Sequence, residues 1–154
     1  MSLVKCHHHS FTVTDMDRSI AFYHDVLGLE LVRVSDRSKI PSYDRLLGHD
    51  NLHIKVAILR HPETDFLLEL IQYLRPVTGQ RPQENHLVGS SHVAFEVDDL
   101  NGLYERLTGA GHDTISPPED VVRDGKLVAR AMFALDPDGI SIELFQEFED
   151  VVKG

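Results

Sequence analysis

The chain has 154 residues, of which 42% are hydrophobic, enough to bury the core of one domain or of two small halves. Its 15 Lys and Arg residues against 25 Asp and Glu residues give a formal net charge of −10. This balance argues against a general binder of nucleic acid or of anionic membranes, because such proteins present a basic face.

Two further features of composition bound the class of protein. No apolar run approaches the roughly 18 residues of a membrane span, and the N-terminus lacks a basic segment followed by a long apolar one, so we expect a soluble, cytoplasmic protein. Cys6 is the only cysteine. A single thiol excludes an intrachain disulfide and thiolate-rich zinc sites, so any metal must be held by histidine and carboxylate side chains.

The first half predicts a strand, a helix and three more strands. A strand of alternating polarity begins at His8, and a helix follows it directly, with an aspartate as the possible cap and Gly28 as the stop. The apolar residues of this helix recur at three-or-four spacing: Met16, Ile20, Tyr23 and Leu27. The later strands are expected near 29–35, 52–60 and 65–74.

The second half predicts the same succession of elements. Its helix is again preceded by an aspartate, and its apolar stripe is Leu100, Leu103, Tyr104 and Leu107. The strands that follow are expected near 112–116, 126–135 and 140–147. The last two are joined by "DPDG" (136–139), a strong turn signal.

The chain is an internal repeat. "HHSFTVTDMDRSIAFYHDVLG" (8–28) and "HVAFEVDDLNGLYERLTGAG" (92–111) both run from a histidine to an aspartate seven residues later. "FLLELIQ" (66–72) returns as "ISIELFQ" (140–146). We therefore predict an α+β fold of two βαβββ modules in tandem within a single domain. The expected boundaries are module one at about 4–75, a linker at 76–89, module two at about 90–147 and a tail at 148–154.

A carboxylate stands in the centre of each repeated apolar run. A strand shows alternate residues to opposite faces, and around Glu69 both faces carry apolar residues. Burying this carboxylate without a partner costs several kcal/mol. By the same alternation His8 and His92 open their modules on the polar face. A lone histidine or glutamate in such a place is more often structural. The pair occurs twice at matched positions, however, and with Glu143 it makes a mixed nitrogen and oxygen set suited to one divalent ion.

The sequence resembles the vicinal oxygen chelate superfamily, which includes glyoxalase I, methylmalonyl-CoA epimerase, extradiol dioxygenases, fosfomycin resistance thiol transferases and bleomycin-resistance binding proteins. The shared text is "H-x-x-x-x-V-x-D-x-x-x-S-x-x-F-Y-x-x-V-L-G" from His8 to Gly28, "HVAFEVDDL" and "DPDGISIEL". The resemblance covers about residues 4–147. It implies paired modules that form a cupped mixed sheet around one metal-binding cleft, often in a homodimer.

The resemblance also implies roles for the four repeated residues. His8, Glu69, His92 and Glu143 fall on the metal positions, and the ion is expected to be Ni, Co, Zn, Mn or Fe. A metal that chelates two adjacent substrate oxygens acidifies the neighbouring C–H and stabilises the enediolate formed on deprotonation. We expect Glu143 to act as the base, with Glu69 as its symmetric counterpart.

Three functions remain open at this point. The first is a metal-dependent lyase or isomerase of the glyoxalase type, acting on a small oxygenated molecule. The second is a single-domain Fe(II) extradiol-type dioxygenase, in which two histidines and one glutamate suffice and Glu69 is a surplus acid. The third is a binding protein like the bleomycin-resistance group, without metal chemistry. Oxygen consumption separates the second from the first, and metal content separates both from the third.

A few further residues are candidates for contact with the substrate. His53 and Lys55 share strand parity and either face the cleft or lie on a solvated edge. No second carboxylate stands on their strand, where the epimerase would be expected to have one. Arg130 either binds a substrate carboxylate or forms a salt bridge. Pocket shape is expected to depend on the loop at 36–51, and Tyr73, on the face of Glu69, is expected to be core.

Overall fold

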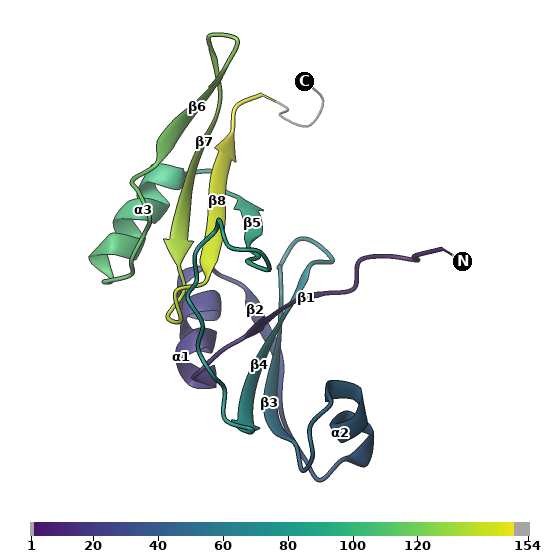
Figure 1. Cartoon of the computed structure of the whole chain (residues 1–154). Coiled ribbons are helices and arrows are strands. Elements are labelled where there is room, and N and C mark those ends of the chain that lie inside the picture. The colour runs from purple at the N-terminus through teal and green to yellow at the C-terminus, as the bar shows by residue number, and fades with distance from the viewer. Residues whose placement is uncertain (1, 150–154) are drawn as a thin grey trace. The chain divides into compact units, whose positions relative to one another are not determined.

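The computed structural model describes residues 2–149 and divides between Arg81 and Pro82 into two compact units, each described by itself. Each unit is built on one four-stranded sheet (Figure 1). The strand orders are β1-β4-β3-β2 and β5-β8-β7-β6. β1 pairs parallel with β4, and β5 pairs parallel with β8, whereas all other neighbouring strands are antiparallel. The predicted α+β fold of two βαβββ modules is confirmed. Of the predicted tail, residues 150–154 lie outside the described residues.

The elements of the first unit follow the predicted order, with one addition. They are β1 (His9–Thr12), α1 (Met16–Ile20), the π-helical segment η1 (Ala21–Val26), β2 (Glu30–Ser38), α2 (Pro41–Leu47), β3 (His53–Arg60) and β4 (Leu67–Arg75). Asp15 caps α1, its carboxylate accepting a hydrogen bond from the backbone N–H of Arg18 at 2.9 Å. Gly28, with φ +79°, turns the chain out of the helical region, as the sequence predicted.

One face of the first sheet packs under α1. Leu68 and Leu70 of β4 lie opposite Leu59 and Ala57 of β3, and all four side chains are fully buried. The helix contacts β3 and β4. Burying each leucine stabilises the fold by about 1.5–3 kcal/mol, so this face is the main core of the unit.

The other face of this sheet is covered at one end by α2, which lies within the segment 36–51 that was expected to be a loop. Tyr43 and Leu47 of α2 pack against a cluster of Leu52, Ile54 and Val56 (Figure 1). Pro41 at the first turn and Gly48 in the left-handed region after the last are the usual signals of a helix start and stop. The helix has only seven residues, so its apolar period was too short to stand out.

The second unit repeats the plan with β5 (Val93–Glu96), α3 (Leu100–Gly109), β6 (Glu119–Arg123), β7 (Lys126–Leu135) and β8 (Ser141–Glu147). Asp99 caps α3 by accepting from the backbone N–H of Gly102 at 3.0 Å. The predicted apolar stripe is buried at Leu100, Leu103 and Leu107. Within residues 2–149, no helix is long and apolar enough to cross a membrane.

The strand expected at 112–116 is the one clear error in the second unit. This segment makes only an isolated bridge, between Thr114 and Ala134. The edge strand is instead β6, which forms a hairpin with β7 through Asp124 and Gly125, both at positive φ. Asp-Gly is a strong signal for such a two-residue hairpin, and the prolines at 117–118 break the chain before it.

Candidate metal-binding residues

In the first unit, His8 and Glu69 come together because β1 and β4 are parallel neighbours. Ser10 is the register partner of Glu69, and His8 immediately precedes β1 on the same parity. His8 Nε2 lies 3.7 Å from Glu69 Oε1, and the Ser10 hydroxyl donates to the same oxygen at 3.4 Å. The Glu69 side chain is only 18% exposed. The carboxylate in the apolar run is therefore met by an imidazole and a hydroxyl.

In the second unit, His92 and Glu143 form the equivalent pair. Ala94 of β5 is the register partner of Glu143 on β8, and His92 immediately precedes β5. His92 Nε2 lies 3.2 Å from Glu143 Oε2. The imidazole also packs edge-on against Phe133 of β7, with ring centroids 5.3 Å apart. This pair has an aromatic neighbour, whereas Ser10 gives the first pair a hydroxyl.

The Ser10 contact was not anticipated from the sequence. Ser10 shares the parity of His8, which was enough to place it on the same face. The parallel register that sets it beside Glu69 is a tertiary feature that no local pattern contains. At the matching position Ala94 has no side-chain donor. The two pairs are thus alike in ligand type and different in their surroundings.

Each unit by itself supplies one imidazole nitrogen and one carboxylate group. Among the described residues, no group of three or more His, Cys, Asp or Glu side chains is gathered closely enough to hold a metal ion. Imidazole and carboxylate donors suit Fe, Co, Ni, Mn and Zn. The chemistry of the two donors in each unit therefore fits a divalent ion.

Of the two alternatives for His53 and Lys55, the register does not support the one that faces the cleft. Lys55 lies opposite Gln72, whereas Glu69 lies opposite Ile58, so Lys55 and Glu69 are on opposite faces of the sheet. His53 Nε2 lies 2.7 Å from the carboxylate of Asp36, whose register partner is Lys55. Both side chains thus belong to the face away from Glu69, which agrees with the alternative of a solvated edge.

Arg130 is also on the far face of its sheet. It lies opposite Gln146, while Glu143 lies opposite Phe133. Its Nε donates to Asp120 Oδ1 at 2.7 Å, which is the salt-bridge alternative that the sequence left open. The hydrogen bond that Arg130 donates to Asp120 raises the pKa of Arg130 further above its ordinary value, so the charge persists at any working pH. A contact with a ligand held at Glu143 is not supported by this placement.

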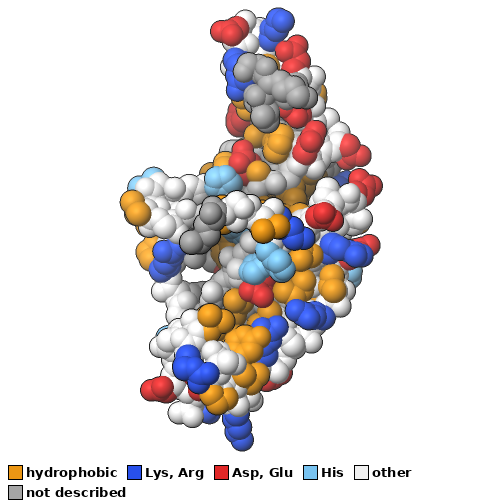
Figure 2. All heavy atoms as spheres, turned by 90° about the vertical axis from the view of Figure 1, so that its right-hand side faces the viewer, with side chains coloured by type: hydrophobic (Ala, Val, Ile, Leu, Met, Phe, Trp, Pro, Cys, Tyr) orange, Lys and Arg blue, Asp and Glu red, His pale blue; other side chains and the backbone are white. Residues whose placement is uncertain are grey.

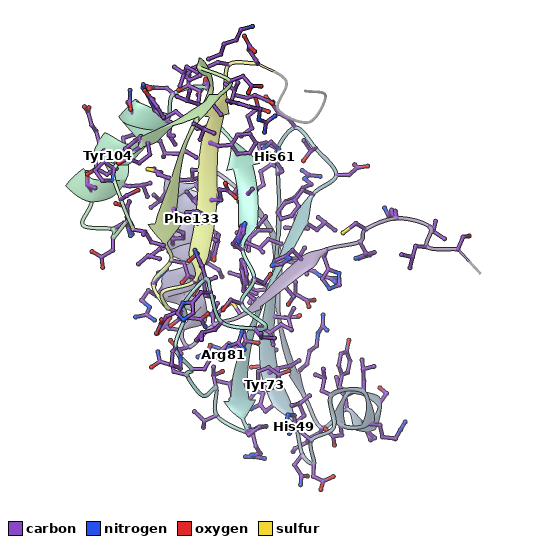
Figure 3. All side chains as sticks on the ribbon, turned by 45° about the horizontal axis from the view of Figure 1, so that its top comes forward. His49, His61, Tyr73, Arg81, Tyr104 and Phe133 are labelled. Atoms are coloured by element: carbon purple, nitrogen blue, oxygen red, sulfur yellow. The ribbon has the colours of Figure 1, made fainter. Side chains whose placement is uncertain are left out.

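Tyr73 lies on the face of Glu69 and is part of the packing there. It packs with α2 against the cluster of Leu52, Ile54 and Val56, as expected for a core aromatic. Its ring meets His49 edge-on, with centroids 6.0 Å apart (Figure 3). His7, which precedes the first candidate ligand, is exposed, and its Nδ1 lies 2.8 Å from Nδ1 of His8.

Comparison with known proteins assigns the family. Residues 5–144 match the model of the Glyoxalase/Bleomycin resistance protein/Dioxygenase superfamily, and the chain belongs to this superfamily. The resemblance drawn from the motifs is confirmed.

Relatives of known name include an epimerase and a lyase. The chain is 28% identical over 145 residues to a 2-epi-5-epi-valiolone epimerase of Actinomyces sp., covering 92% of this chain and 78% of that protein. It is 27% identical over 139 residues to a lactoylglutathione lyase of Haemophilus influenzae, covering 90% of each. A crystal structure of a glyoxalase family protein from Bacillus cereus shares the fold, with a TM-score of 0.83, 23% identity and 96% coverage of both chains. These relatives agree with a lyase or isomerase of the superfamily.

Proposed function

We propose that this protein is a metal-dependent lyase or isomerase of the glyoxalase type, which moves a proton next to a carbonyl of a small oxygenated substrate. The observation that supports it is the His–Glu pair found twice at the same register, His8 with Glu69 and His92 with Glu143. Two unrelated surface pairs have no reason to fall on equivalent positions of two sheets. The names of the relatives, a lyase and an epimerase, agree with this reaction type.

In this proposal the four residues together hold one divalent ion, with both pairs drawn from one chain or from two chains of a homodimer. The imidazoles and carboxylates supply a mixed donor set that leaves one or two positions open. When bound, such an ion polarises two adjacent oxygens of a substrate and acidifies the C–H beside them. The protein's own residues then have to accept that proton and return it.

Glu143 is the better placed of the two carboxylates to carry the proton. The Ser10 hydroxyl already donates to one oxygen of Glu69, whereas the matching residue beside Glu143 is Ala94. Glu143 therefore keeps more of its lone pairs available for a substrate proton. The Glu143 side chain is also the more exposed of the two, at 29% against 18% for Glu69, so a substrate reaches it more readily. Glu69 is assigned mainly to holding the ion.

The test follows the proton directly. Metal-loaded protein is incubated in D₂O with the hemithioacetal of methylglyoxal and glutathione, and with simple 2-hydroxy ketones, and deuterium at the carbon next to the carbonyl is measured by NMR. The proposal predicts incorporation that falls at least a hundredfold in Glu143→Gln and less in Glu69→Gln at saturating metal. Consumption of oxygen with catechols, and no deuterium exchange, would instead identify a dioxygenase. Tight ligand binding without bound metal or turnover would identify a binding protein.

A further inference from the structure

The edge strand of the first sheet places basic residues on the face of Glu69. Register pairs run from β2 through β3 to β4, so Arg33 shares a row with Ile58 and Glu69. The next row along this face is Ser35, Val56 and Ile71, and the one after it is Arg37, Ile54 and Tyr73. This face of β2 thus carries two guanidinium groups and a hydroxyl between them.

Arg37 is held in place by two neighbours. Its Nε donates to Ser35 Oγ at 3.2 Å, and its Nη1 donates to the Tyr43 hydroxyl at 2.8 Å. Its guanidinium carbon lies 5.0 Å from the centroid of the Tyr43 ring. Tyr43 is itself fixed, because α2 packs against the apolar cluster below it. The bond to Ser35 turns the side chain back along β2, toward the row that contains Glu69.

The charge of Arg37 is not neutralised within residues 2–149. Its two hydrogen-bond acceptors are hydroxyl groups, and no carboxylate of the described residues lies within ion-pair distance of it. The carboxylate next to it in sequence, Asp36, pairs with His53 on the other face. In a chain of net charge −10, a half-buried cation without an acidic partner is unusual. Guanidinium groups held in this way match the geometry of a carboxylate.

Within its described residues, 82–149, the second unit offers no counterpart, although its fold is the same. On the face of Glu143, β6 carries Glu119 opposite Ala131 and Val121 opposite Ala129. Asp120 of β6, which accepts the hydrogen bond from Arg130, lies on the far face of the sheet. The basic face is therefore a property of the first unit. Figure 2 shows Lys and Arg side chains interleaved with hydrophobic ones over the end of the molecule that carries α2.

We propose that Arg37, positioned by Ser35 and Tyr43, binds a second, anionic group of the substrate, a carboxylate remote from the oxygens held at Glu69. Arg37 is a specificity-determining residue in this scheme, and Tyr43 is a positioning residue. This inference deepens the proposed function and rests on it for the location of the other end of the substrate.

The sheet geometry gives the span of such a substrate. Ser35 lies in the same row as Ile71, two strands away, and Ile71 is two residues from Glu69 along β4. Because strands are about 4.8 Å apart and each residue adds about 3.3 Å, the Cα atoms of Ser35 and Glu69 are about 12 Å apart. A separation of this order suits a short substrate that carries an anionic group at each end, such as a five-carbon 2-oxo diacid.

The first experiment tests the anion site without any metal. In metal-free protein, the ¹⁵Nε–H signal of Arg37, assigned by its loss in Arg37→Gln, is followed during titration with acetate and with the neutral isostere acetamide. We expect a saturable shift with acetate alone, weakened in Tyr43→Phe. The Nε–H of Arg45, an exposed arginine on α2, is the internal control and is expected to stay in place. No shift at Arg37, or an equal shift at Arg45, overturns the proposal.

The second experiment tests the coupling to the metal-bound end. Calorimetry on metal-loaded protein compares 2-oxoglutarate with 2-oxopentanoate, which has the same chelating end and a methyl group in place of the remote carboxylate. We expect 2-oxoglutarate to bind about tenfold more tightly, the size typical of a hydrogen bond to a charged group. The preference is expected to vanish in Arg37→Gln, to shrink in Tyr43→Phe and to survive in the matched control Arg45→Gln.

The two experiments separate the failure of this inference from that of the proposed function. A preference for the diacid that persists in Arg37→Gln, or no preference at all, contradicts the role of Arg37 while leaving metal chemistry intact. If neither acid binds the metal-loaded protein, the chelating role at Glu69 fails, and the acetate titration then decides the anion site by itself.

Discussion

The side-chain amide of Gln72 donates a hydrogen bond to the carbonyl oxygen of Thr14 at 2.8 Å. The amide oxygen of the same residue accepts from the backbone N–H of Met16 at 3.3 Å, so β4 is tied to the turn between β1 and α1. Gln146 makes the matching pair of contacts in the second unit, to the carbonyl oxygen of Asp98 at 2.6 Å and to the N–H of Leu100 at 3.4 Å. In each unit, the glutamine three residues after the candidate glutamate thus fixes the chain just beyond the strand that follows the partner histidine.

We predict that Gln72→Met destabilises the fold by about 1–2 kcal/mol, because it keeps the volume of the side chain and leaves partly buried backbone groups of the turn without a partner. Gln146→Met is expected to act in the same direction. Urea unfolding followed by circular dichroism measures the change. Gln80→Met, at an exposed position, is the control and should change the free energy of unfolding by less than about 0.5 kcal/mol. Equal stability of all three variants would show that the contact has no structural role.

Replacing Glu69 by Gln should weaken metal binding and leave the fold intact. The substitution keeps the shape and removes the negative charge that a divalent ion needs from this ligand. Ser10 still has an oxygen to which its hydroxyl can donate, so we expect little loss of stability. Metal affinity measured with a competing chelator checks this. Unchanged affinity would remove Glu69 from the metal site.

His53→Ala should leave the metal content unaltered. The imidazole lies on the face away from Glu69 and pairs with Asp36, and such a half-exposed pair contributes no more than about 1 kcal/mol. Elemental analysis of the variant beside the wild-type protein measures the effect. Loss of metal here would show that the wrong face of β3 was assigned to the site.

Arg130→Gln should change neither metal affinity nor the binding of substrate. Its guanidinium donates to Asp120 on the face opposite to Glu143. A raised pKa keeps the stabilising charge present at every pH below the ordinary value, so the variant should not alter the pH dependence of stability near neutrality. Melting curves at pH 6 and pH 9, together with metal titration, test both statements. If the variant loses affinity for ligand while its fold stays intact, Arg130 does contact the substrate.

Much of the fold could be predicted because the chain contains the same unit twice. The spacing from histidine to aspartate, the helix stripes and the two ELIQ-like runs each appeared in both halves, and each repetition supported the other. The errors fall where the halves differ. The helix Pro41–Leu47 has no counterpart among the described residues of the second unit. The edge strand Glu119–Arg123 follows a pair of consecutive prolines, and the first unit has no such pair.

The alternation of residues within a strand predicted which side chains share a face. It could not predict which residues of two neighbouring strands come into contact. Alternation places His8 and Ser10 together, but only the parallel register brings them beside Glu69. For His53 and Lys55 parity alone could not decide between the cleft and a solvated edge. The face of a strand relative to its neighbour depends on register, and a shift of one residue exchanges the two faces. Arg37 could not be identified from the sequence because Tyr43, which positions it, belongs to a helix that was not predicted.

The most direct test of the proposed metal site is elemental analysis of protein purified without an affinity-metal column, beside His92→Ala, His8→Ala and the control His53→Ala. We predict about one equivalent of a transition metal per chain, retained in the control and lost in both histidine variants, because the proposed site uses both histidines. If instead the wild-type protein holds no metal after soaking in Ni, Co, Mn, Fe or Zn, or if loss of one histidine leaves the metal in place, the proposed metal site is wrong.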